Sequence, residues 1–249
     1  MKTTRILLLS LFAFAAASVL AQPDIAVSRA WDNVAVPNGG AFAFPPTGTN
    51  IPDSRLFRIS NTGPGLLEIS NASSIVSGAC FHLIETPASS VVSGQSTTFR
   101  VRVLCGTPGF YSGTISISSN DPDENPYVIS LSAEVRGPDI AVYRSGVFQA
   151  DGSSFTFPDG HFSPQSQVFE IKNTSLGDLT LSSITVSGQG FTLIESPSSM
   201  TVPGGTSVFF RVRFYTLQVG TFYGSITINS NDPDESPYDI ALVGRQALD

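Results

Sequence analysis

The stretch Phe99-Arg100-Val101-Arg102-Val103 alternates apolar and charged side chains, and Phe210-Arg211-Val212-Arg213-Phe214 has the same pattern. A period of two places successive side chains on opposite faces of a β-strand. The apolar face is then buried against a second layer, and the arginines lie on the solvent side. The chain is therefore predicted to contain half-buried strands.

Further runs with this period lie on both sides of these stretches. They predict strands over residues 24–29, 56–60, 66–70, 81–85, 114–118 and 127–133, and over 168–172, 225–229 and 238–242. Turn-forming residues such as Asn61-Thr62-Gly63 separate the runs, and no helical period is present. The fold class is predicted to be all-β.

The apolar positions of the runs define a predicted core with two matching sets of side chains. The first set is Phe57, Ile59, Leu67, Ile69, Phe99, Val101, Val103, Ile115, Ile117, Ile129 and Leu131, and the second is Phe169, Ile171, Leu179, Leu181, Phe210, Val212, Phe214, Ile226, Ile228, Ile240 and Leu242.

Two longer motifs show that the chain is a tandem duplication. The residues 23–27 (Pro-Asp-Ile-Ala-Val) return at 138–142, and residues 119–127 (Ser-Asn-Asp-Pro-Asp-Glu-Asn-Pro-Tyr) return at 230–238 with one change. A spacing of about 115 residues exceeds solenoid periods and suits a small domain. About seven strands in each copy are typical of an immunoglobulin-like sandwich.

We therefore predict two tandem immunoglobulin-like β-sandwich domains, a first repeat of residues 22–136 and a second repeat of residues 137–249. The short junction at residues 134–138 predicts a semi-rigid, end-to-end pair. One barrel made of all the strands is the competing architecture, but it does not explain the duplication.

Residues 1–21 have the pattern of a secretory signal peptide. Lys2 and Arg5 precede a short apolar run, and small residues precede a cleavage point after Ala21. No Cys follows Ala21 and the C-terminus has no hydrophobic tail, so no lipid or membrane anchor is expected. We expect a chain exported to the periplasm, the cell surface or the medium, with no membrane span after cleavage.

The charge of the exported chain argues against nucleic-acid binding. Removal of Lys2 and Arg5 leaves 11 basic residues against 20 acidic ones, and the basic residues are scattered. Nucleic-acid partners require a basic patch. The expected partner is a protein. Its identity is left open, and so is the oligomeric state of this chain.

The order of several motifs resembles the abnormal-spindle/hydin (ASH) type of immunoglobulin-like domain, and it is similar to bacterial choice-of-anchor D proteins. The motifs are Phe57-Arg58-Ile59-Ser60-Asn61-Thr62-Gly63, Phe81 to Glu85, Phe99 to Val103, Gly109 to Ile115 and the Ser-Asn-Asp-Pro turn. The resemblance covers both repeats. It implies a structural or protein-binding module without shared catalytic residues.

Cys80 and Cys105 are the only cysteines. Disulfides persist outside the cytoplasm, and antiparallel pairing of residues 81–85 with 98–103 would bring both cysteines to one end of the ladder. We predict a disulfide. The second repeat has Gly190 and Thr216 at these positions, so the bridge is an accessory to the fold.

The repeated acidic turn offers oxygen ligands for calcium. Its carboxylates are Asp121, Asp123 and Glu124 in the first repeat, with Asp232, Asp234 and Glu235 in the second. The other interpretation is that the turn supplies hydrogen bonds to the backbone of the last hairpin. No EF-hand glycine or twelve-residue loop is present, which favours the second interpretation.

Binding candidates on the surface are the outward arginine pairs and one tryptophan. The pairs are Arg100 with Arg102 and Arg211 with Arg213, and the tryptophan is Trp31. Solvated strand charges are the simpler interpretation of the arginines, with Glu170 a possible cross-strand neighbour of Arg211.

Catalysis has little support in the sequence, since His82 and His161 lie in different repeats and no nucleophile, metal or phosphate motif occurs. We predict no enzyme activity and no cofactor. The predicted function is a noncatalytic, exported spacer or protein-interaction module. The alternatives are a carbohydrate-binding or adhesion module and a periplasmic chaperone that binds edge strands.

Overall fold

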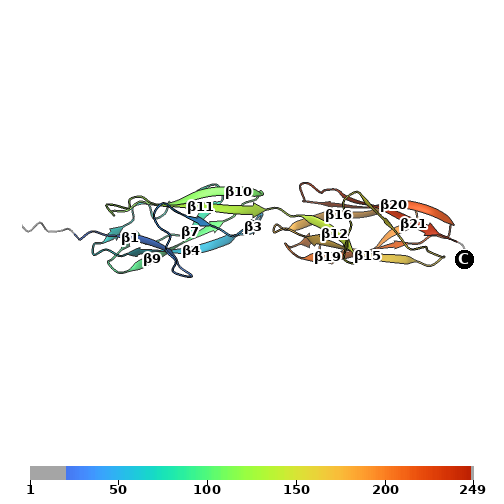
Figure 1. Cartoon of the computed structure of the whole chain (residues 1–249), viewed down its shortest axis with the longest axis horizontal. Coiled ribbons are helices and arrows are strands. Elements are labelled where there is room, and N and C mark those ends of the chain that lie inside the picture. The colour runs from blue at the N-terminus through green and yellow to red at the C-terminus, as the bar shows by residue number, and fades with distance from the viewer. Residues whose placement is uncertain (1–20, 248–249) are drawn as a thin grey trace, which may run out of the picture.

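The computed structural model describes residues 21–247, and these residues form an all-β structure (Figure 1). The predicted signal peptide lies outside the described residues except for Ala21. No helix within residues 21–247 has the length and hydropathy needed to cross a membrane. The prediction of an all-β fold is confirmed.

The first repeat is a sandwich of two sheets. One sheet has the order β1 (Ile25–Arg29), β4 (Asp53–Asn61), β9 (Ser96–Val103) and β7 (Phe81–Glu85). The other has the order β2 (Gly40–Ala43), β11 (Tyr127–Arg136), β10 (Gly109–Ile117) and β6 (Val76–Ser77), with β3 (Thr47–Gly48) beside β11. A short ribbon pairs β5 (Leu67–Glu68) with β8 (Ser90–Val91).

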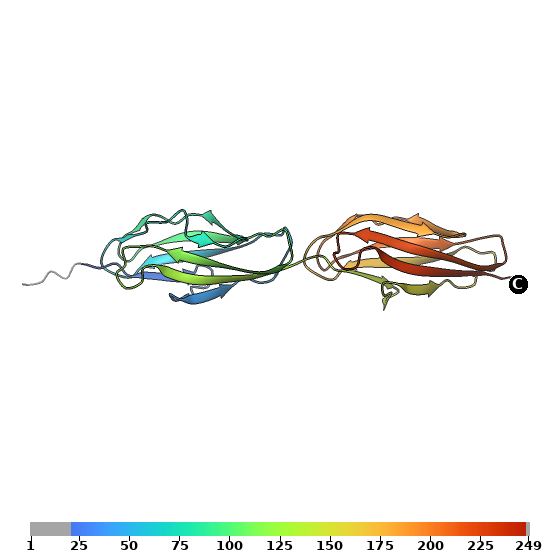
Figure 2. The ribbon, with the colours of Figure 1, turned by 90° about the horizontal axis from the view of Figure 1, so that it is seen from above.

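The second repeat has the same two layers. Its first sheet has the order β13 (Val147–Phe148), β12 (Ile140–Arg144), β15 (Gln165–Asn173), β19 (Ser207–Phe214) and β17 (Phe191–Glu195). Its second sheet has the order β14 (Ser153–Thr156), β21 (Tyr238–Gln246), β20 (Gly220–Ser230), β16 (Leu179–Ser187) and β18 (Thr201–Val202). Figure 2 shows the two layers of each repeat from above.

Apolar side chains gather in two separate clusters, one from residues 25–135 and one from residues 140–242. Every side chain of the predicted core is buried in one of them. No sheet in the described part of the chain combines strands of both repeats, so the alternative of a single barrel is not the structure. These are two immunoglobulin-like β-sandwiches.

One pairing was not predicted from the sequence. Strand β2 runs parallel to β11, and β14 runs parallel to β21, so an early strand of each repeat lies beside the last strand. The segment Gly40-Ala41-Phe42-Ala43 carries one large apolar side chain, which is too little for a period-two pattern to stand out.

The repeats lie end to end in Figures 1 and 2. The amide of Gly177, in a turn of the second repeat, donates a hydrogen bond to the carbonyl of Gly137 at 3.2 Å. A Cβ atom on Gly48, at the end of β3, would lie 2.3 Å from the carbonyl oxygen of Leu176. Backbone therefore meets backbone at this junction.

Candidate functional site

The only two cysteines form a disulfide at one end of the β7–β9 ladder. Phe81 of β7 pairs with Val103 of β9, and the amide of Leu104 donates to the carbonyl of Cys80 at 3.0 Å. The Cα atoms of Cys80 and Cys105 are 5.3 Å apart. The strand pairing that predicted the bridge is the pairing that the structure has.

The two repeated motifs meet in space. The carboxylate of Asp121, in the turn between β10 and β11, accepts a hydrogen bond from the amide of Ile25 at the start of β1, at 2.7 Å. Its other oxygen accepts from the amides of Asp123 at 3.1 Å and Glu124 at 3.3 Å. Asp121 is 2% exposed. A buried carboxylate therefore connects the first strand to the last hairpin by hydrogen bonds.

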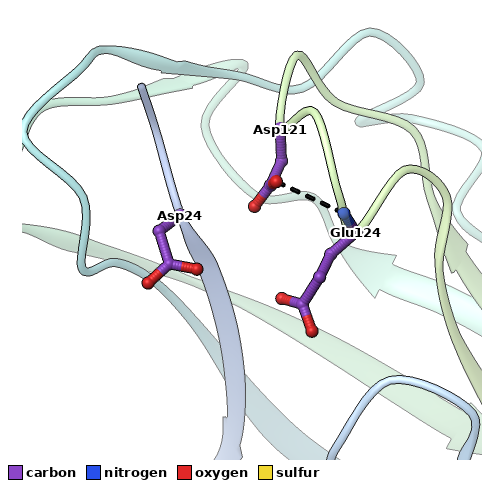
Figure 3. A group of neighbouring side chains, drawn as sticks. All are labelled: Asp24, Asp121 and Glu124. Atoms are coloured by element: carbon purple, nitrogen blue, oxygen red, sulfur yellow. Dashed lines mark hydrogen bonds between the residues drawn. The ribbon is translucent and has the colours of Figure 1, made fainter. Parts of the chain in front are cut away.

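Figure 3 shows that Asp24 and Glu124 lie beside Asp121. One carboxylate oxygen from each of the three residues lies within 4.8 Å of the others. The sequence prediction named Asp121 and Glu124 but missed Asp24, and the structure does not bring Asp123 into this group. The repetition of residues 23–27 was the available signal, because both motifs recur together.

Hydrogen bonding and burial move the pKa values of this cluster in opposite directions. Burial is the largest influence on the Asp121 carboxyl and raises its pKa, but the amide hydrogen bonds from Ile25, Asp123 and Glu124 outweigh it, and the pKa is lowered. Burial, followed by the negative charges of Asp121 and Asp24, raises the pKa of Glu124. The pKa of the neighbouring Asp123 carboxyl is raised as well, first by its side-chain hydrogen bond with Asp121 and then by the negative charge of Asp121.

The second repeat has the same arrangement. Asp232 accepts from the amide of Ile140 at 2.7 Å and from the amides of Asp234 and Glu235 at 3.2 Å and 3.3 Å. Asp139, Asp232 and Glu235 form the matching group of carboxylates. The matching set of backbone amide donors supplies a structural reason for the repetition of the turn.

A buried asparagine completes this end of each sandwich. The Asn61 amide group donates to the carbonyls of Gly65 at 2.6 Å and Val91 at 2.9 Å, and its oxygen accepts from the amides of Gly63 at 3.1 Å and Asp24 at 3.3 Å. Asn173 makes the four corresponding bonds in the second repeat, at residues 139, 175, 177 and 202. All of the side-chain groups are satisfied.

The arginine pairs lie on the outward face of the first sheet, as predicted. Arg100 forms an ion pair with Glu85 at 2.8 Å, and Arg211 forms one with Glu195 at 3.0 Å. Val168 is directly opposite Arg211 in the ladder, so Glu170 is a diagonal neighbour of Arg211 and not its direct partner.

The second arginine of each pair, Arg102 or Arg213, forms no ion pair of this kind in the described part of the chain. Arg102 lies opposite His82 in the ladder, and Arg213 lies opposite Thr192. The Nε atoms of Arg102 and Arg213 are buried without a hydrogen-bond partner. All four arginines are partly exposed, so both pairs are accessible on this face.

Trp31 borders a depression on the outward face of the first repeat. The depression has a volume of about 390 Å³ and is lined by Trp31, Ser54, Arg55, Leu56 and Arg100. Trp31 is 49% exposed, and its ring meets those of Phe42 and Phe57 edge to face at centroid distances of 5.9 Å and 6.2 Å. We call this hollow the first-repeat depression.

A second hollow occupies the corresponding place on the second repeat. It has a volume of about 470 Å³, and its lining is Tyr143, Ser145, Gly146, Ser166, Gln167, Val168, Glu170 and Phe209. We call it the second-repeat depression. Ser54 and Ser166 occupy equivalent positions, since each lies three residues before the buried phenylalanine of its strand, Phe57 or Phe169. Sequence reasoning missed this site, because its residues come from three separate strands.

No protein-family model matches the chain, and no curated protein matches it. Three similar solved structures are a protein of unknown function from Porphyromonas gingivalis W83, the ASH/PapD-like domain 7 of human CEP192, and domains 4 and 5 of the S-layer protein SbsC. Their identities to this chain are 16%, 9% and 13%, with TM-scores of 0.33, 0.33 and 0.35. The matches cover 89%, 54% and 92% of this chain and 99%, 100% and 100% of the other chains.

Proposed function

We propose that the protein is a noncatalytic, exported spacer that binds other proteins through the outward sheet faces of its two repeats. One observation carries the proposal. Both repeats have a depression at the same place on the first sheet, but the side chains that line the two hollows differ in charge and shape. A duplicated scaffold with two different surfaces is suited to contacts that each repeat makes separately.

The arrangement of titratable groups supports a noncatalytic function. His82 lies on β7 opposite Arg102, and His161 belongs to the other repeat. The buried carboxylate of Asp121 is used by backbone amides of the same fold. The resemblance to ASH-type repeats, and with it a structural or binding function, belongs to this proposal.

Affinity capture with matched variants tests the binding function. The wild type is compared with a triple variant, Tyr143→Ser, Glu170→Arg and Phe209→Thr, which gives the second repeat the residues that the first repeat has at these positions. Phe110→Thr removes an exposed aromatic outside the depression and is the control. We expect proteins from the envelope or medium of the source organism to be captured by the wild type and the control and lost with the triple variant. Capture that is the same for all three proteins contradicts the proposal.

Small-angle scattering tests the spacer function. Two sandwiches held end to end give a distance distribution with one maximum from distances within repeats and another from distances between them. The close approach of Gly48 of the first repeat to the Leu176 carbonyl of the second, together with the short junction, supports a fixed spacing. A single compact maximum contradicts the spacer.

Carbohydrate binding is the second candidate, favoured by the half-exposed ring of Trp31. An aromatic ring at the surface offers a face on which sugar rings can stack. Binding to a glycan array that is lost in Trp31→Ala, with an unchanged melting temperature, would support this function. An array without bound glycans excludes it for the sugars displayed.

A further inference from the structure

One row of outward side chains distinguishes the second repeat from the first. In the second repeat the ladder pairs Phe148 with Tyr143, Tyr143 with Glu170, and Glu170 with Phe209. Directly opposite residues of an antiparallel pair have Cβ atoms about 5 Å apart. The row therefore crosses four strands and places one carboxylate between aromatic side chains.

The first repeat has an entirely different row at the same place. Its ladder pairs Ala35 with Ser28, Ser28 with Arg58, and Arg58 with Thr98. The buried neighbours of the two rows match, since Phe57 and Phe99 stack at 5.4 Å as Phe169 and Phe210 do at 5.3 Å. The core alone thus does not require the aromatic row.

The aromatic rings of the row are accessible. Phe209 is 55% exposed and Phe148 is 52% exposed, and the rings of Phe148 and Tyr143 lie 5.6 Å apart. Exposed aromatic side chains cost hydration free energy in the free protein. Clustered aromatic rings around a hollow are typical of recognition surfaces.

Glu170 supplies the only charge in the lining of the second-repeat depression. The hydroxyl of Ser207 donates to its carboxylate at 2.6 Å and orients it. No lysine or arginine within residues 21–247 forms an ion pair with Glu170, since Arg211, at the diagonal position of the ladder, pairs with Glu195. The nearby Arg144 donates to Gln167 at 3.4 Å and lies over the ring of Phe155 at 4.5 Å.

We propose that this depression binds an arginine or lysine side chain of a partner protein, with Glu170 as the counter-ion and Tyr143 and Phe209 as cation–π partners. The inference rests on the proposed function, because it names the chemistry of the partner. A cation gains from both the carboxylate and the aromatic faces. A neutral occupant such as a sugar would donate hydroxyl hydrogen bonds to the carboxylate but would leave its charge without a counter-ion.

A titration with matched peptides tests the ligand chemistry. The exported protein, labelled with ¹⁵N, is titrated with N-acetyl-Gly-Arg-Gly-amide and with the same peptide carrying citrulline, which has nearly the shape of arginine but no charge. We expect the arginine peptide to shift the amide signals of residues 143, 168, 170 and 209. The citrulline peptide should leave these signals in place.

Variants then assign the contributions of individual side chains. Tyr143→Ser and Phe209→Thr should each raise the apparent Kd about threefold to fivefold, and Glu170→Gln should raise it about fivefold. Phe110→Thr should leave the Kd unchanged. Circular dichroism and the melting temperature check that each variant is folded, which we expect because the first repeat has serine and threonine at the corresponding positions.

Several outcomes would overturn the proposal. The first two are a citrulline peptide that binds as tightly as the arginine peptide, and amide shifts at residues outside the depression. The other two are variants with an unchanged Kd for the arginine peptide, and saturable shifts of the same amide signals by methyl β-glucoside. If the arginine peptide fails while the triple variant still loses captured proteins, this inference is wrong and the proposed function stands. If neither experiment shows binding, both are wrong.

Discussion

Replacing Asp121 with asparagine removes one charge and changes the geometry very little. The carboxylate faces backbone donors on both sides, the Ile25 amide at 2.7 Å and the amides of Asp123 and Glu124 at 3.1 Å and 3.3 Å. An asparagine has one oxygen and one NH₂ group. In either orientation of the asparagine side chain, its NH₂ group faces a backbone amide that is also a donor, so at least one hydrogen bond is lost.

The magnitude follows from these contacts. A hydrogen bond to a charged group contributes about 1.5–3 kcal/mol, and a buried donor left without an acceptor costs about 1–3 kcal/mol. Asp121 is almost fully buried, so water is a poor substitute. We expect the free energy of unfolding of the first repeat to fall by about 3 kcal/mol, which lowers its melting temperature by about 10 °C.

Calorimetry and guanidinium unfolding measure this loss. Asp123→Asn removes the same charge two residues away. The exposed Asp123 side chain makes no corresponding contact to β1, so this variant should not lower the free energy of unfolding. Asp232→Asn should reproduce the loss in the second repeat. If Asp121→Asn behaves like Asp123→Asn, the reasoning is wrong. A melting temperature that rises in calcium relative to chelator would instead identify the carboxylates as a cation site.

Other predictions concern the same end of the sandwich and the disulfide. Because the folded-state pKa of Glu124 is raised above 4.5, its protonation stabilises the fold fully below pH 4.5, and this contribution is lost as the pH rises through the raised pKa. Glu124→Gln should flatten that part of the stability profile, and an unaltered profile contradicts the assignment. Asn61→Ala should cost about 3 kcal/mol in urea unfolding, since four backbone groups lose their partner. Replacing Cys80 and Cys105 with alanine should cost about 3 kcal/mol for a loop of 25 residues, and no change would mean that the bridge is dispensable.

The core was predictable from the sequence because its signal is local. Alternation within Phe99 to Val103 determines which side chains share a face, whatever the strand pairs with, and the second copy repeats the alternation at Phe210 to Phe214. The disulfide was predictable for a related reason, since β7 and β9 are close in sequence and Cys80 and Cys105 border them.

The contact between Ile25 and Asp121 was not predictable in this way. These residues are 96 positions apart, and their hydrogen bond depends on how the first strand enters the sheet relative to the last hairpin. The only sign of this contact in the sequence was that the motifs containing both residues recur in the second repeat. The row of Tyr143, Glu170 and Phe209 has no signal in the sequence. These residues are neighbours only because of the registers in which β12, β15 and β19 pair.

The duplication separates the residues that maintain the fold from those available for function. Among the positions with the same side chain in both repeats, Asn61 and Asp121 hold backbone groups and Phe57 fills the core. Positions that differ on the outward face, such as Arg58 and Glu170, have no such duty in the sandwich. Since two copies with different surfaces keep the same fold, exchanging a row of surface residues between repeats should transfer binding without loss of stability. A chimera in which the first repeat acquires tyrosine, glutamine, glutamate and phenylalanine at positions 28, 55, 58 and 98 should then bind the arginine peptide at both repeats. A folded chimera with one binding site would contradict this separation.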